Sequence, residues 1–244
     1  MKTTGKLRII GFLVAGFIIL ISTACNVINE PVFGGTVKDA DGNVYHTVTI
    51  GNQTWMIENL KTTRFNDSTL IPLVIDSAAW INLKTPGHCW YNNDSTSFNG
   101  TYGTLYNWFA VNTGILAPKG WHVATEAEWT TLESNVSQFM TLSGSLPKIL
   151  ASTSNWKGSI GSSTPGNNSK INNSSGFSAQ PGGTRSNTIF SFNEVGYKGA
   201  WWSSTKNDSI SARSLSISYK LNTVDWGKSQ MQYGFSVRCI KDSN

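Results

Sequence analysis

Hydrophobic and polar residues alternate in the first part of the chain that has the pattern of folded structure. Residues 44–50 alternate between apolar and polar side chains, Gly51 and Asn52 follow, and residues 53–57 continue the pattern. Strict alternation is typical of a half-buried β-strand, and a glycine-containing pair between two such runs is typical of a tight turn. Together with the shorter run 36–38, this pattern predicts a meander of antiparallel strands.

A polar cluster with two aspartates separates the first two of these runs. Asp39, Asp41 and Gly42 match the start of an EF-hand calcium loop, which also requires a Glu at its twelfth position. That position is Ile50 in this chain, so we predict a plain Asx–Gly turn instead. The three histidines have no metal-ligand spacing with the cysteines, and the sequence predicts neither a metal site nor a cofactor.

One segment carries a strong helix-start signal. Thr125 followed by Glu128 is a capping box, in which each side chain satisfies a backbone N–H group of the first turn. Trp129, Leu132 and Val136 then fall on one face of the helix. Glu126 and Glu128 lie near two tryptophans in the sequence, so a catalytic acid is conceivable, but helix capping explains both carboxylates without any catalysis.

Two shorter apolar segments also have helical spacing, residues 105–111, which end near Gly114, and residues 146–150. Residues 152–176 are rich in Ser, Asn, Gly and Thr, and they predict a long surface loop with room for a small hairpin. Strand patterning returns at residues 200–204, 213–221 and 235–240. The pattern as a whole predicts one domain of the α+β class.

The N-terminus has the layout of a secretory signal peptide. Lys2, Lys6 and Arg8 precede an apolar run at 9–21, and small residues then lead into Cys25. The apolar run is shorter than the ~20 residues that a membrane-spanning helix needs. The sequence therefore predicts export from the cytoplasm.

The small residues that lead into Cys25 resemble a bacterial lipobox, in which the cysteine is lipidated and becomes the first residue. Position 22 is Ser where the common pattern has a large aliphatic residue. Ordinary cleavage near Ala24 and an uncleaved anchor are the alternatives. We predict lipid attachment at Cys25, with a signal peptide at 1–24, a lipidated tether at 25–35 and a single folded domain at 36–244.

The net charge of the mature chain is small. Removal of the leader leaves 19 − 3 = 16 basic residues against 14 acidic residues, a net charge of +2. So small a charge does not indicate a nucleic-acid partner. We expect a chain that contacts a membrane through its lipid anchor and lies in the cell envelope, at the outer membrane.

Several segments resemble one family when they are taken together. They are DGNVYHTVTIGNQTWMIENLKT (41–62), CWYNND (89–94), YGTLYNWFAV (102–111), APKGWHVATEAEW (117–129), SGFSAQPGGTR (175–185), WWSST (201–205) and GFSVRC (234–239). In this order they are similar to the Fibrobacter succinogenes major paralogous (FISUMP) domain, a family found mainly in exported proteins and lipoproteins of Gram-negative bacteria.

The resemblance implies a fold similar to C-type lectins and formylglycine-generating enzymes, with two main helices flanking twisted, mostly antiparallel sheets and long loops. Fold likeness does not carry activity. The oxidase form of this fold needs a pair of copper-binding cysteines near the C-terminus, and Cys239 has no near neighbour of that kind. The sequence also has none of the motifs of calcium-dependent sugar-binding lectins.

Cys89 and Cys239 are the only cysteines after Cys25. In an oxidising compartment they can form a disulfide, or they can remain two buried thiols. The family commonly has Cys-Pro where this chain has Ala117 and Pro118, so the resemblance leaves Cys89 as the one candidate partner of Cys239.

The ten tryptophans are the main indication of a ligand site. Aromatic faces bind sugars by stacking, while neighbouring amide and carboxyl groups supply hydrogen bonds. In the pair 201–202, strand alternation predicts one ring turned inward and one outward. The candidate ligand-binding residues are Trp90, Tyr91, Asn92, Asn93, Asp94, Trp201, Trp202 and Asn207.

The sequence contains no nucleophile elbow, zinc-protease motif or phosphate-binding loop, and it names no catalytic residue. The leading hypothesis is an envelope-anchored, non-enzymatic binding or adhesion module, whose ligand is a glycan or a partner surface protein. A hydrolase-type enzyme on a scaffold like that of the formylglycine-generating enzymes is the alternative. A purely structural envelope component is the third hypothesis.

Overall fold

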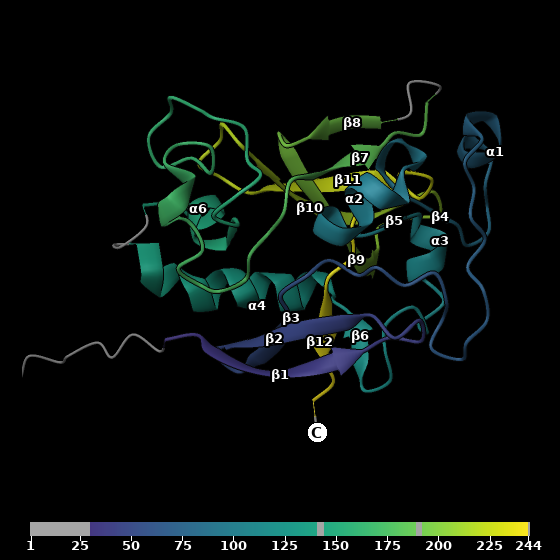
Figure 1. Cartoon of the computed structure of the whole chain (residues 1–244), viewed down its shortest axis with the longest axis horizontal. Coiled ribbons are helices and arrows are strands. Elements are labelled where there is room, and N and C mark those ends of the chain that lie inside the picture. The colour runs from purple at the N-terminus through teal and green to yellow at the C-terminus, as the bar shows by residue number, and fades with distance from the viewer. Residues whose placement is uncertain (1–29, 141–143, 189–191, 244) are drawn as a thin grey trace, which may run out of the picture.

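The computed structural model describes residues 30–140, 144–188 and 192–243. Two five-stranded sheets have the strand orders β1-β2-β3-β12-β6 and β11-β10-β9-β7-β8, and β4 and β5 form a separate two-stranded sheet. The first sheet lies below the second in Figure 1, and helix α4 (Glu126–Val136) runs between them along one side. Helices and mostly antiparallel sheets in one chain confirm the predicted α+β class.

The first sheet contains the predicted meander. Its strands are β1 (Val32–Lys38), β2 (Val44–Ile50), β3 (Gln53–Met56), β6 (Trp121–Val123) and β12 (Cys239–Lys241). Strand β12 pairs with β3 on one side and with β6 on the other, so the last strand of the chain joins β6 to the meander. The predicted tether 25–35 is too long, because Val32, Phe33 and Gly34 already pair with β2.

The predicted turn at 39–43 is confirmed. One oxygen of the Asp39 carboxylate accepts hydrogen bonds of 2.9 Å from the backbone N–H groups of Asp41 and Asn43. The other oxygen accepts a hydrogen bond of 2.5 Å from the Tyr45 hydroxyl. The carboxylate thus holds the turn in place, as expected for an Asx turn.

The second sheet contains β7 (Gly182–Arg185), β8 (Phe192–Val195), β9 (Lys198–Lys206), β10 (Ser211–Ser218) and β11 (Asp225–Gln230). Strands β9 and β10 contain most of the predicted segments 200–204 and 213–221. The predicted strand 235–240 is mostly wrong, because only its last two residues belong to β12, and Phe235 and Ser236 make isolated bridges.

The capped helix was predicted correctly, whereas the segment 105–111 was not. In α4 the Thr125 and Glu128 side chains form both halves of the capping box. Residues 105–106 instead form β5 (Leu105–Tyr106), paired with β4 (His88–Cys89), and α3 (Trp108–Val111) is a single turn. The Asn107 side chain accepts a hydrogen bond from the Ala110 N–H group, so the helix cannot begin before residue 108.

The remaining helices are α1 (Ser77–Ile81), α2 (Ser95–Tyr102) and α6 (Leu146–Leu150). Helix α6 was predicted with these bounds, while α1 and α2 were not predicted. The long loop 152–176 was also predicted, but within it the structure has one short 3-10 turn, Ser169–Ile171, and no hairpin.

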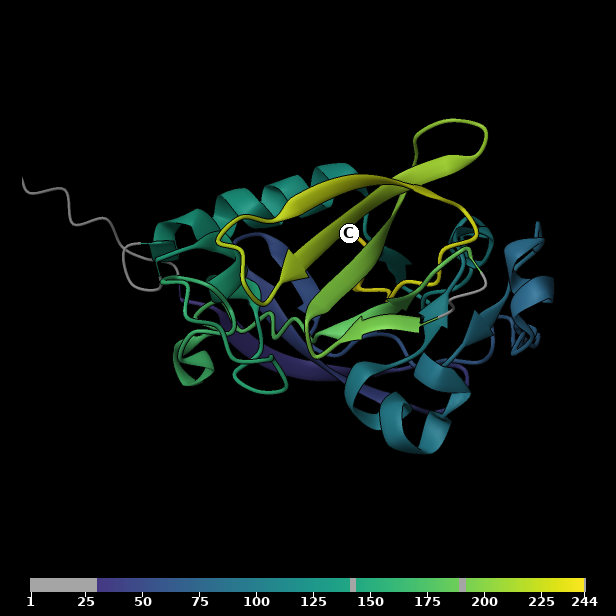
Figure 2. The same ribbon diagram turned by 90° about the horizontal axis from the view of Figure 1, so that it is seen from above.

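The core around α4 joins the two sheets. The Trp129 ring of α4 lies 5.1 Å from Trp55 of the first sheet and 6.3 Å from Trp201 of the second, measured between ring centroids. Leu132 and Val136 are also buried on this face, as the helical spacing predicted. Helix α4 therefore fills the space between the sheets at one end of the molecule, and α1 lies at the other end in both views (Figures 1 and 2).

Candidate ligand-binding site

The outward-facing ring predicted in the pair 201–202 does not exist. Trp201 and Trp202 point to opposite faces of β9, as alternation predicts, but both are 0 % exposed. Strand β9 lies in the middle of its sheet, and apolar side chains cover both of its faces. Each indole N–H group has a buried partner at 2.8 Å, the Asn59 side-chain oxygen for Trp201 and the Tyr106 carbonyl for Trp202. Neither residue can contact a ligand.

Asn207 also has a local structural role. Its amide group donates hydrogen bonds of 2.8 Å to the carboxylate of Asp208 and to the hydroxyl of Ser211. These bonds shape the turn between β9 and β10, and they occupy the donor that a ligand would need.

The polar residues after Trp90 have structural roles in the turn and in the helix that follow. Asn92 and Asn93 have φ angles of 52° and 57°, which Asn adopts more readily than most residues. The Asp94 side chain caps α2 by accepting a hydrogen bond from the Ser97 N–H group. Tyr91 is buried, and its ring lies 5.1 Å from that of Phe98. Of the predicted segment 90–94, only Trp90 stays a candidate.

The two cysteines do not form a disulfide in the structure. Cys89 and Cys239 are both free, and they lie in different apolar clusters. Burial raises the pKa of the Cys89 thiol to about 11, although the nearby Arg185 guanidinium lowers it, and burial raises the pKa of Cys239 well above its usual value. Both groups are therefore protonated and unreactive at neutral pH.

Trp90 lines a pocket with a histidine that the sequence did not single out. The pocket has a volume of about 320 Å³ and is lined by Thr63, Leu70, Ile71, Pro72, Leu73, His88 and Trp90. We call it the His88–Trp90 pocket. The two rings meet edge to face, with 5.3 Å between their centroids and an angle of 88° between their planes.

The polar atoms of these two rings have no partners. Among the described residues, four buried side-chain nitrogen or oxygen atoms lack a hydrogen bond. Three of the four belong to this pocket: the Nδ1 and Nε2 atoms of His88 and the Nε1 atom of Trp90. The fourth belongs to Trp129 in the core around α4. A buried donor or acceptor left without a partner costs about 1–3 kcal/mol, so a ligand that satisfies these atoms would gain free energy.

His88 is neutral at physiological pH. The residue is 2 % exposed, and burial lowers its pKa below the usual value of 6.5, although the Ile71 and Pro72 carbonyls oppose this shift. Neither carbonyl reaches hydrogen-bond geometry with the ring. A neutral imidazole offers one donor and one acceptor, and the Trp90 indole offers a second donor.

The backbone that forms the pocket is well supported. The His88 N–H group donates to the Pro72 carbonyl, and the Val74 N–H group donates to the His88 carbonyl, both at 3.0 Å. The buried Arg185 guanidinium donates to the carbonyls of Val74 and Ile75 at 2.5 and 3.0 Å. Segment 63–75 is therefore fixed beside β4, which gives the pocket a defined shape.

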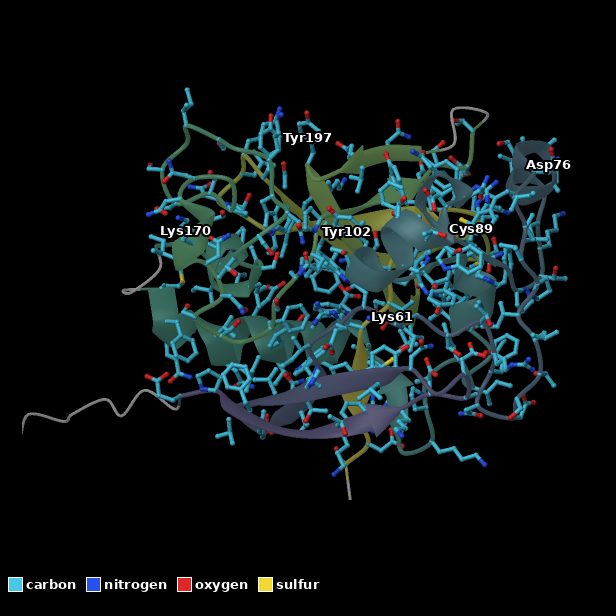
Figure 3. All side chains as sticks on the ribbon, viewed as in Figure 1. Lys61, Asp76, Cys89, Tyr102, Lys170 and Tyr197 are labelled. Carbon is cyan, nitrogen blue, oxygen red and sulfur yellow. The ribbon has the colours of Figure 1, made fainter. Side chains whose placement is uncertain are left out.

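Exposed apolar side chains surround the pocket. Leu70, Leu73 and Ile75 are 65 %, 50 % and 57 % exposed. Figure 3 labels Asp76 and Cys89 in this region, toward the end of the molecule opposite the start of β1. The pocket thus lies toward the end of the domain opposite the start of β1.

Two other groups of residues resemble sites but have their polar atoms occupied. A hollow of about 540 Å³ over β1 and β2 includes His46, whose ring is bound to Glu58 at 2.7 Å. His122 lies between Glu128 and Asp242 at 2.7 and 2.6 Å, and the Glu128 carboxylate is the main cause that raises the pKa of His122 to about 9. These groups bind one another, which indicates a structural role.

Sequence reasoning missed His88 because a single histidine without metal-ligand or catalytic spacing carries no sign of a site. The residue becomes part of a pocket only when segment 63–75 folds back beside β4, through contacts that no local pattern predicts. Trp90, two residues later in the sequence, was the one usable signal. The predicted lipid site at Cys25 lies outside the described residues.

The fold and the pocket define an α+β domain with a small, mostly apolar pocket. The model of the Fibrobacter succinogenes major domain matches residues 48–241, and the chain belongs to this family. Neither the curated proteins nor the solved structures contain a match to this chain.

The described residues contain neither a membrane-spanning helix nor a metal-binding cluster of side chains. No helix in this part of the chain is long and apolar enough to cross a membrane. No group of three or more His, Cys, Asp or Glu side chains in the same residues is arranged to hold a metal ion.

Proposed function

We propose that this chain is a non-enzymatic binding module of the cell envelope, held at the outer membrane by a lipid on Cys25. Its ligand site is the His88–Trp90 pocket, and its ligand is a partner surface protein. The single observation that carries the binding role is the set of three unpartnered buried nitrogen atoms of His88 and Trp90 beside an apolar pocket. Unpartnered buried polar atoms are rare in native proteins and call for an explanation such as a ligand.

The lining of the pocket favours a protein over a glycan. A sugar brings many hydroxyl groups that need partners, whereas most of this lining is the aliphatic side chains of segment 70–73. Exposed apolar side chains around a pocket are typical of the centre of a protein interface. An aromatic side chain with one polar end, such as Tyr, would fill the pocket and pair with His88 or Trp90.

The hydrolase-type alternative lacks support at this pocket. A catalytic histidine works with a nucleophile and with a group that orients its ring. In the described chain no carboxylate or hydroxyl is hydrogen-bonded to either ring nitrogen of His88. The nearby Thr63 hydroxyl donates to Asp41 at 3.0 Å. A purely structural component would have no use for unpartnered buried polar atoms beside an open pocket, so binding is the function that the geometry favours.

We also propose that the domain has a C-type-lectin-like architecture. Two twisted, mostly antiparallel sheets, a main helix packed between them and long loops support this proposal. The likeness concerns the arrangement of elements and implies no sugar-binding site of the lectin type.

The anchor is tested by metabolic labelling. Growing cells that receive a clickable palmitate analogue should label the wild-type chain, while a Cys25→Ser variant should take up no label. Two acyl chains on one cysteine would give stable membrane attachment, so wild type should also sediment with membranes. An unlabelled wild-type chain, or equal labelling of the variant, would remove the envelope part of the proposal.

The binding site is tested by photo-crosslinking in the native host. A benzophenone amino acid at position 70, where Leu70 is 65 % exposed beside the pocket, should give a discrete adduct with one protein. The control position is 160, because Ile160 is fully exposed on the long loop and would report random collisions. A carbohydrate adduct at position 70, or the same protein adduct from both positions, would contradict the proposal.

A further inference from the structure

A second hollow, which the proposed function does not use, lies on the sheet that contains β7, β8, β9 and β11. It has a volume of about 490 Å³, and its lining includes Thr184, Asn193, Glu194, Lys198, Tyr233 and Phe235. In contrast to the His88–Trp90 pocket, charged and hydroxyl-bearing side chains make up most of this lining. We call it the Glu194–Tyr233 hollow.

One wall of this hollow is aromatic. The rings of Tyr233 and Phe235 lie 5.4 Å apart between centroids, with 35° between their planes. Phe235 in turn packs on the buried ring of Trp202 at 4.5 Å, so the core supports the wall from behind. A supported aromatic wall can stack against the apolar face of a sugar ring.

Three polar side chains of the hollow are available to bind a ligand. Within the described residues, the Glu194 carboxylate, the Lys198 ammonium group and the Tyr233 hydroxyl form no hydrogen bond or ion pair. A carboxylate accepts hydrogen bonds, an ammonium group donates them, and a hydroxyl does both. These groups match a ligand that carries several hydroxyl groups.

Two successive residues of β8 line the same hollow. Residues 193 and 194 would face opposite sides of a regular strand, yet both line the hollow. Glu194 has a φ angle of +67°, which interrupts the alternation. Opposite it lies Gly183, where an added Cβ atom would come within 2.5 Å of the Asn193 carbonyl oxygen. A Glu held in this unfavourable conformation is a feature often found at binding sites.

We infer that the Glu194–Tyr233 hollow binds a neutral sugar. The aromatic wall takes the apolar face of the ring, and Glu194, Lys198 and Thr184 take its hydroxyl groups. One carboxylate and one ammonium group leave the lining without a net charge, so it does not favour a phosphate, a sulfated glycan or a nucleic acid. The site is separate from the His88–Trp90 pocket and would add glycan binding to the same domain.

The first test uses a glycan array and the full chain purified in detergent. The array presents neutral hexoses and N-acetylhexosamines together with sialylated and sulfated glycans. We expect binding to neutral glycans and none to the sialylated or sulfated ones. Binding of no neutral glycan above background, or a preference for the anionic glycans, would overturn the inference.

The second test measures affinity for the strongest neutral array glycan by titration calorimetry. Glu194→Gly removes the carboxylate and also relieves the positive φ angle, so it should keep or raise the melting temperature. Lys198→Met removes the ammonium group, and each variant should weaken binding by about tenfold or more. Lys228→Met, an exposed position on β11, is the matched control and should bind as wild type does. Wild-type affinity in Glu194→Gly and Lys198→Met would refute the site.

Discussion

Replacement of Arg238 by Met should lower the free energy of unfolding by about 3–5 kcal/mol, the cost of disrupting a buried charged network. Arg238 is 0 % exposed and donates to the Asn59 side chain at 2.9 Å and to the carbonyls of Met56, Phe177 and Ser178 at 2.8, 2.7 and 3.0 Å. Methionine fills similar space but offers no donor, so the hydrogen bonds from Arg238 to these acceptors are lost.

The contacts of Arg238 explain why its replacement should lower the free energy of unfolding so strongly. Its guanidinium stacks 4.4 Å from the Phe177 ring and binds main-chain groups of two segments that are far apart in the sequence. Asn59 also accepts from Trp201, at 2.8 Å. Burial lowers the pKa of Arg238 to about 9, which still leaves it charged at neutral pH. The Arg238 side chain thus joins β3 to the segment before β7, and Asn59 links this group to Trp201 of β9.

Urea unfolding of the purified variants measures this prediction. Arg64→Met is the control, because Arg64 has a 42 % exposed side chain and makes an ion pair of 3.1 Å with Asp41. An exposed pair of this kind contributes about 0–1 kcal/mol. If the free energy of unfolding falls by the same small amount in both variants, Arg238 does not have the role described.

Replacement of Lys148 by Met should destabilise the protein by about 2–4 kcal/mol and open the long loop, because charged hydrogen bonds contribute about 1.5–3 kcal/mol each. Lys148 is 3 % exposed, and its ammonium group donates to the Asn172 side chain at 2.9 Å and to the Thr164 and Asn168 carbonyls at 3.4 Å. It also donates to the Asn167 carbonyl. A single ammonium group therefore holds both ends of segment 164–172.

Limited trypsin digestion reports the loop directly. In Lys148→Met, cleavage after Lys157 and Lys170 should become rapid, whereas wild type should resist at both positions. Lys220→Met, an exposed position in the turn after β10, should behave as wild type in digestion and in urea unfolding. Unchanged resistance in Lys148→Met would mean that the ammonium group does not secure the loop.

The parts of the fold that sequence predicted are those governed by local rules. The capping box at Thr125 and the apolar face of α4 depend on residues within a few positions of one another, and both appeared as predicted. Helices α1 and α2 were missed because their start signals, Asp76 and Asp94, are followed by few buried residues. Their positions depend on tertiary contacts rather than on an amphipathic pattern.

The site was harder to predict because burial of a side chain depends on the whole fold. Alternation correctly gave Trp201 and Trp202 opposite directions, but it could not show that β9 is covered on both faces. For the same reason the sequence did not predict the burial of Arg238 and Lys148. Both are charged residues whose partners are mainly main-chain carbonyls distant in sequence. The sequence also did not predict the burial of His88, because the segment that covers it, residues 63–75, is distant along the chain.

The central claim, that the His88–Trp90 pocket binds a partner protein, is tested most directly by the photo-crosslinked adduct formed at position 70. Its yield in cells should fall about tenfold or more in a Trp90→Phe background, since Phe keeps an aromatic ring at this position but lacks the unpartnered N–H group of the indole. Trp226→Phe is the matched control, because Trp226 is also half-buried and its N–H group already donates to Glu133 at 2.9 Å. The account predicts loss of the adduct in Trp90→Phe and wild-type yield in Trp226→Phe. Equal yields in the two variants would contradict it.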